Sequence, residues 1–72
     1  MSDVGSARRA KDELKTKFGG AAWCAGIGVE REDGVGFIVR VTVRPGEVAA
    51  AKAAGLPEHI GPTMVKMIEG DA

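Results

Sequence analysis

The chain's single cysteine, Cys24, and single histidine, His59, are the side chains best suited to nucleophilic catalysis, with the imidazole as general base for the thiol. Cys24 falls in a segment that alternates like a strand, and His59 falls in a proline-flanked loop. Their spacing in the sequence does not predict that the two side chains lie close together, and the sequence contains no Asn to orient the imidazole. We therefore expect Cys24 to be a small apolar filler and His59 a loop residue, and predict that the protein is not an enzyme.

Gly26 and Gly28 begin a G-x-G pattern that invites comparison with a dinucleotide-binding loop. The third glycine of that motif would stand at position 31, which is Arg31, and a hairpin turn at Asp33-Gly34 follows instead of a helix. One cysteine, one histidine and scattered carboxylates also fall short of the clustered ligands of a zinc site. The sequence predicts neither cofactor nor metal, and we interpret the glycines as strand positions that permit close approach.

The composition excludes several other classes of protein. Lys plus Arg number 10 and Asp plus Glu number 10, so the formal net charge is zero. This balance argues against a basic nucleic-acid arm, an acidic tail and a polybasic membrane anchor. The hydrophobic fraction of 44% is too high for a disordered chain, and residues 1–72 suffice for one small domain.

The compartment is inferred from three features. Residues 1–15 include acidic side chains and no apolar stretch, unlike a signal peptide, and a single cysteine cannot form an internal disulfide. The longest uncharged stretch, residues 18–29, is far short of the ~20 apolar residues that cross a bilayer. We expect a cytoplasmic protein that makes no contact with a membrane.

Two segments have the pattern of helices. Residues 6–18 carry an apolar stripe among charged side chains, at Ala7, Ala10, Leu14 and Phe18. Ser6 is the candidate N-cap, and Gly19 ends the pattern. The alanine-rich residues 46–54 predict a second, shorter helix.

Residues 23–44 predict a hairpin with one buried face. One row is apolar: Trp23, Ala25, Ile27, Val29, Val35, Phe37, Val39, Val41 and Val43. The opposite row holds Cys24, Gly26, Gly28, Glu30, Gly36, Ile38, Arg40, Thr42 and Arg44. Asp33-Gly34 between the strands favours a type I′ turn, in which both central residues have positive φ. Residues 63–69 predict a third strand, which buries either Val65 and Met67 or Met64 and Ile68.

The element order α-β-β-α-β predicts an α+β protein, a two-layer sandwich with both helices on one face of the sheet. The connection through the second helix should make strands two and three parallel. With strand one placed between them, the three-stranded mixed sheet has the order 3-1-2. This arrangement corresponds to a ferredoxin-like plait that lacks its first strand.

A basic helix, a glycine-containing strand, an apolar return strand, a Leu-Pro loop and a closing strand follow one another over residues 8–70. The residues that carry this pattern are Gly26, Ile27, Gly28, residues 35–43, Leu56, Pro57, Ile60, Gly61 and Gly70. In this order the chain resembles a small bacterial domain found beside, or N-terminal to, some trypsin-like serine proteases. The resemblance implies an α/β-plait accessory or interaction module, and it implies no catalytic residue because this chain holds no protease domain.

The sheet face away from the helices is the predicted partner interface. It would present Cys24, Gly26, Gly28, Ile38, Arg40 and Arg44, without the dense Lys/Glu cover of a solvated sheet. A second copy packed there would enlarge a small core, so we predict a homodimer and leave open an unidentified protein partner. Arg40 and Arg44 would meet Glu30 across that interface.

Weak nucleic-acid or anion binding is the alternative function. Its candidate residues are Arg8, Arg9, Lys15 and Lys17 on the first helix, or Arg40 and Arg44 on the sheet. Sheet-based RNA binding relies on stacked aromatic side chains, and the predicted open face has none. Nucleic acid is therefore the less favoured partner.

Overall fold

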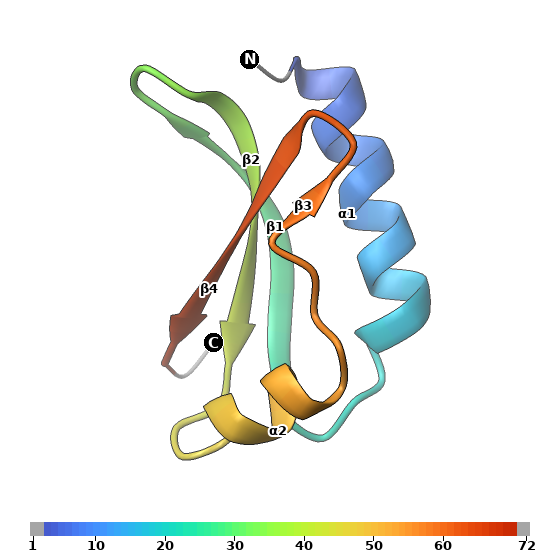
Figure 1. Ribbon diagram of the computed structural model, residues 1–72, viewed down its shortest axis with the longest axis vertical. Coiled ribbons are helices and arrows are strands. Elements are labelled where there is room, and N and C mark those ends of the chain that lie inside the picture. Colours follow the sequence, from blue (N-terminus) through green and yellow to red (C-terminus); the bar gives the residue numbers. More distant parts are fainter. Residues whose placement is uncertain (1–2, 71–72) are drawn as a thin grey trace.

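The computed structural model describes residues 3–70 and contains two helices and a four-stranded sheet (Figure 1). In chain order the elements are α1 (Val4–Phe18), β1 (Cys24–Glu32), β2 (Gly36–Val43), α2 (Val48–Ala53), β3 (His59–Ile60) and β4 (Thr63–Glu69). The α+β class is confirmed. The predicted count of three strands is wrong, because residues 59–60 form a short additional strand against β4.

The strands are ordered β1-β2-β4-β3, which corrects the predicted order 3-1-2. β1 and β2 are antiparallel, and β2 and β4 are parallel, as expected from the helical connection between them. β2 and β4 are the inner strands, and β2 pairs with β1 on one side and with β4 on the other. Ile38 and Val39 on β2 are 1% and 0% exposed although they are consecutive, so β2 is buried on both faces at this point, whereas the following Arg40 is exposed. β1, with its glycines and charged end, lies at the edge.

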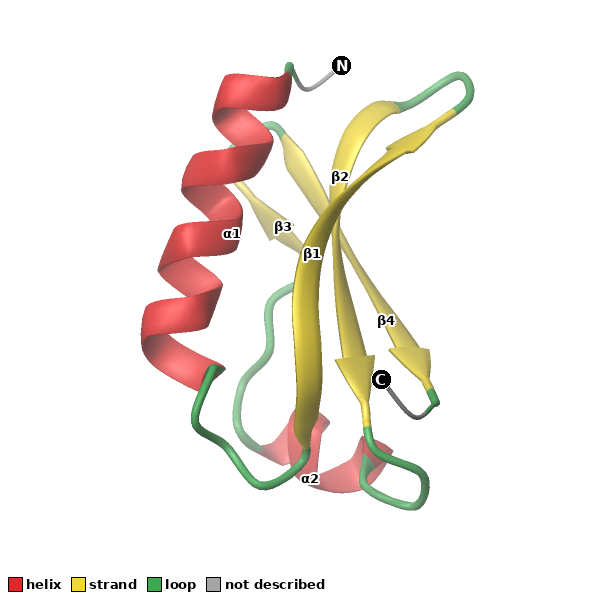
Figure 2. Cartoon of the chain, turned by 180° about the vertical axis from the view of Figure 1, so that it is seen from behind, coloured by secondary structure: helices red, strands yellow, loops and turns green. Residues whose placement is uncertain are grey.

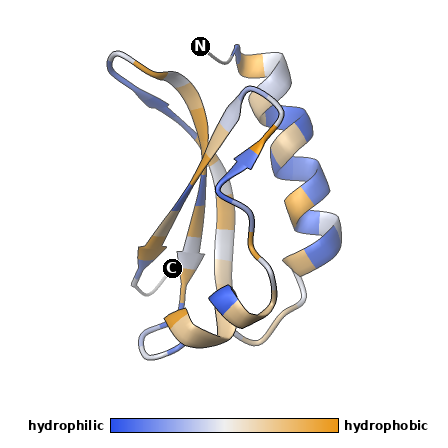
Figure 3. Ribbon diagram, viewed as in Figure 1, coloured by the Kyte–Doolittle hydropathy of each residue, from blue (hydrophilic) through white to orange (hydrophobic). Residues whose placement is uncertain are grey.

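Helix α1 begins two residues earlier than its apolar stripe suggested. The Oδ1 atom of Asp3 accepts a hydrogen bond of 2.7 Å from the amide of Ser6, so Asp3 and not Ser6 is the N-cap. That hydrogen bond also holds the pKa of the Asp3 carboxyl below its usual value near 3.8. Figure 3 shows apolar positions recurring among hydrophilic ones along the helix.

The hairpin between β1 and β2 is confirmed, but its turn is not type I′. Glu32 pairs with Gly36, which leaves a three-residue loop, and the amide of Val35 donates to the carbonyl of Glu32 at 3.1 Å. The positive φ values belong to Gly34 (80°) and Gly36 (97°), whereas Asp33 keeps a negative φ. A glycine takes each left-handed position, so no residue with a side chain is strained there.

Trp23 and Cys24 both belong to the core, which corrects the expected alternation. Cys24 lies opposite Val43, but Gly26 lies opposite Thr42, so the register shifts by one residue between them. This β-bulge turns Cys24 to the same side as Val43, whereas Trp23 lies in the turn before β1 and packs into the same core. Trp23 is 7% and Cys24 8% exposed.

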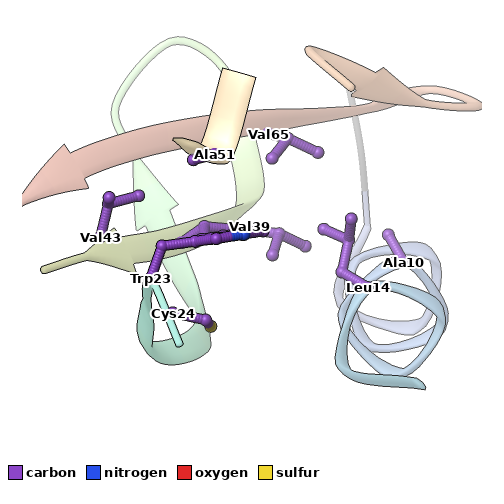
Figure 4. Close-up of a cluster of buried hydrophobic side chains, with 9 residues drawn as sticks. Ala10, Leu14, Trp23, Cys24, Val39, Val43, Ala51 and Val65 are labelled. Carbon is purple, nitrogen blue, oxygen red and sulfur yellow. The ribbon is translucent and has the colours of Figure 1, made fainter. Parts of the chain in front are cut away.

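The core lies between the inner face of the sheet and the two helices (Figure 4). Its buried members are Ala10, Leu14, Trp23, Cys24, Val39, Val41, Val43, Ala51 and Val65. The ring centroids of Phe18 and Trp23 lie 5.6 Å apart at the lower end of α1. Ala51 of α2 joins the same cluster, so both helices contribute to one core.

The facing of β4, which the sequence left open, follows from its parallel register with β2. Val65 pairs with Val39 and is 8% exposed, and Met67 packs against the core, whereas Met64 is 38% exposed. Val65 and Met67 therefore face inward. Within residues 3–70, no helix has the length and apolar character needed to cross a bilayer.

Candidate functional site

The candidate site lies on the outer face, which is the sheet face away from α1. Two rows of paired residues cross β1, β2 and β4 there. The upper row is Gly28, Arg40 and Lys66, and the lower row is Gly26, Thr42 and Ile68. In both rows β1 contributes only a glycine, so at these two rows the outer face has no side chain over that strand.

A shallow depression of about 540 Å³, the outer hollow, lies over these rows. It is lined by Gly26, Ile27, Gly28, Arg40, Thr42, Ile68 and Gly70. A Cβ atom built on Gly26 or Gly28 would meet no heavy atom within 4 Å, and neither residue has a positive φ. The packing of the chain therefore does not require glycine at either position.

The hairpin end of the outer face is covered by charged side chains. Arg40 Nη1 lies 3.2 Å from Glu30 Oε2, and Lys66 Nζ lies 4.0 Å from Glu32 Oε1. The second pair joins β4 to β1 across β2, where Ile38 is 1% exposed. The outer face thus has a charged end and a bare end.

The structure separates the six predicted interface residues. Gly26, Gly28 and Arg40 line the outer hollow, and Arg44 is exposed just past the end of β2. Cys24 is in the core and Ile38 is buried, so neither side chain is available to a partner. Arg40 forms its ion pair with Glu30 of its own chain, whereas the sequence predicted that it would meet Glu30 of a second copy.

Sequence reasoning missed the β4 wall of the outer hollow. Ile68 and Gly70 line it because β4 lies directly beside β2, whereas the expected sheet placed β1 there. The one signal for them in the sequence was Ile38, an apolar residue in the otherwise glycine-containing and polar outer row of β2.

The basic residues proposed for anion binding are dispersed around α1. Arg9 lines a hollow on the β3–β4 side, where its Nη2 donates to Ser6 Oγ at 3.4 Å. Lys17 pairs with Glu13 at 3.9 Å. Lys15 lines a separate hollow beside β1. The fold therefore does not bring all four of these helix cations together, because Arg9 and Lys17 lie on another side of α1 from Lys15.

Cys24 and His59 lie on strands at opposite edges of the sheet, with β2 and β4 between them. With neighbouring strands about 4.8 Å apart, the two residues are far beyond hydrogen-bond reach. Among the described residues, no group of three His, Cys, Asp or Glu side chains could hold a metal ion.

In comparisons with known proteins, the chain matches no family model, no curated protein and no solved structure. The resemblance to a domain beside trypsin-like proteases stays a prediction.

Proposed function

We propose that the chain is a non-enzymatic interaction module that self-associates by packing the outer faces of two copies together. The observation that carries this proposal is the outer hollow, where Gly26 and Gly28 leave the sheet bare although a Cβ atom would fit. Glycine in a strand costs about 0.5–1 kcal/mol relative to alanine. The chain gives up this stability without any gain in its own packing, which supports a role for the bare surface outside the monomer.

The charges on the outer face favour a second copy as the occupant. Glu30 and Glu32 lie at the hairpin end, and Arg44 lies at the opposite end, where it makes no ion pair with any residue from 3 to 70. When two outer faces pack with their strands antiparallel, Arg44 of one copy comes opposite Glu30 and Glu32 of the other, which are also paired with Arg40 and Lys66 of their own chain. An interface of roughly 800 Å² per copy is typical of stable complexes. The accessible surface of the described chain is 4444 Å².

The proposal is tested by light scattering after size-exclusion chromatography over a range of protein concentrations. We expect a mass of two chains at high concentration and of one chain, 7.4 kDa, on dilution. Gly28→Thr should weaken the dimer by at least about tenfold, because the new side chain fills the outer hollow. Gly20→Thr is the matched control, since Gly20 also has open space around its Cβ position but lies in the α1–β1 loop.

Two results would overturn the proposal. One is a single-chain mass at every concentration tested. The other is a Gly28→Thr dimer as tight as the parent dimer while circular dichroism shows the variant folded.

A further inference from the structure

Strand β1 has an unpaired edge. β2 is its only neighbour in the sheet, and no other backbone hydrogen bond within residues 3–70 involves Gly26–Arg31. Figure 2 views the molecule with β1 foremost, and no helix or strand lies in front of it. An exposed edge of this length can pair with another extended chain through main-chain hydrogen bonds.

Two hollows flank the same stretch of that edge. The outer hollow lies on one side of β1, and a smaller one of about 110 Å³, the edge pocket, lies on the other side, beneath the end of α1. The edge pocket is lined by Lys15, Gly19, Cys24, Ala25, Gly26 and Ile27. Successive side chains of a strand point to opposite faces. A strand added beside β1 would therefore direct alternate side chains toward the two hollows.

Three basic side chains of α1 stand in one row beside this edge, with Asp12 on the exposed side of the row. Lys15 lines the edge pocket, and Lys11 and Arg8 stand four and seven residues before it, in the same row of the helix. We call these three residues the basic strip. None of them forms an ion pair with a residue from 3 to 70, whereas Glu13, the acidic residue of the opposite flank, pairs with Lys17.

We propose that the β1 edge binds an extended acidic segment of a partner protein as a fifth strand of the sheet. The main chain of the segment pairs with Gly26–Arg31. Its inward-facing carboxylates meet the basic strip, and its outward-facing side chains lie over the outer hollow. This proposal goes beyond self-association, because it names a different partner and uses the edge of the sheet together with α1.

A second copy does not fit this edge. Antiparallel pairing of two β1 strands would place both α1 helices on the same side of the joined sheet, with their basic strips facing each other. Like charges so placed repel, whereas an acidic segment neutralises them. A nucleic acid supplies phosphates but no main chain that can pair with a strand, and no aromatic side chain lines the outer hollow for stacking.

The probe is an end-blocked peptide of about eight residues with alternating Glu and Val, which matches the period of a strand. It is titrated into the labelled protein at low salt, and amide chemical shifts are followed by NMR. We expect saturable shifts centred on residues 26–31 and slower hydrogen exchange of the amides there. The control peptide has the same charge but carries proline at every second Val, which removes ladder donors.

The paired variants are Lys11→Glu/Lys15→Glu on the basic strip and Arg9→Glu/Lys17→Glu on the opposite flank. They make the same change in net charge, so only position distinguishes them. The first variant should weaken peptide binding by at least about tenfold more than the second. The mass measured by light scattering should be the same for both, since neither pair lies on the outer face.

Three outcomes would overturn the proposal: no binding at millimolar peptide, equal affinity for the proline-containing peptide, or tighter binding of an oligonucleotide of equal charge to the same residues. If the peptide fails while the protein still dimerises, only the edge proposal falls. If the peptide binds a protein that stays monomeric, only the self-association proposal falls.

Discussion

The inner and outer faces of the same sheet differ in how completely the chain fills them. On β2, Val39, Val41 and Val43 are fully buried against the helices, whereas Thr42, between two of them, borders the outer hollow. On β1, Ile27 packs against the core while Gly26 and Gly28 leave the other face bare. The difference indicates that most of the buried apolar side chains that stabilise the fold lie on the inner face.

The largest expected effect on stability comes from removing a buried side chain from the core on the inner face. Leu14 is 0% exposed at the centre of the core, so Leu14→Ala should lower the free energy of unfolding by about 2–5 kcal/mol. Chemical denaturation followed by circular dichroism measures the loss. Ile68→Ala, on the half-buried wall of the outer hollow, is the matched control and should cost less than about 1.5 kcal/mol. Equal losses at both positions would contradict the division between the faces.

Two glycine substitutions, one near each face, should change the stability of the fold in opposite directions. A Cβ at Gly19 would collide with the carbonyl oxygen of Lys15, whereas a Cβ at Gly28 would meet nothing. Gly19→Ala should therefore destabilise the fold by about 1–3 kcal/mol. Gly28→Ala should stabilise it by about 0.4–1 kcal/mol, because the unfolded chain loses freedom.

Thermal unfolding of both glycine variants measures whether each substitution raises or lowers the melting temperature. The measurement is made at a concentration where light scattering gives the mass of one chain. A Gly28→Ala protein that melts below the parent protein would show that the monomer itself needs glycine on the outer face.

The smallest expected effect is at the N-cap of α1, away from both faces. Because the pKa of Asp3 is lowered in the folded state, its contribution to stability is present above its unfolded value near 3.8 and is lost as the pH falls through the folded pKa. Asp3→Asn keeps a cap that does not titrate. As the pH is lowered from about 5 to about 2, the melting temperature of the parent protein should therefore fall relative to that of Asp3→Asn. A constant difference would exclude a titrating cap.

Most of the fold follows from periodicity in the sequence. The apolar row from Val39 to Val43 and the stripe from Ala7 to Phe18 predicted the core-facing sides of β2 and α1, because burial on one face imposes a period of two or of about 3.6. Cys24 was misplaced because a β-bulge breaks that period without any marker in the sequence. The two-residue strand β3 is too short to show a period at all.

The candidate site was harder to predict than the core. Gly26, Gly28 and Arg40 were found because glycines and a charge on one face of a strand stand out in the alternation. Ile38 was misassigned because it is buried between neighbouring strands on both sides of β2, and strand order depends on contacts distant in sequence. The unpaired edge of β1 likewise emerges only once β4 is placed beside β2 and not beside β1.

The position of β2 between β1 and β4 has a consequence for how the protein folds during synthesis. Its antiparallel neighbour β1 precedes it by one short turn, but its parallel neighbour β4 leaves the ribosome last among the described strands. Until then, β2 offers a free edge of strongly apolar sequence, and pairing across a longer stretch of chain is slower than closing a hairpin. We therefore expect off-pathway strand pairing and chaperone binding to occur mainly while the β1–β2 hairpin has formed and β4 has not yet been synthesised.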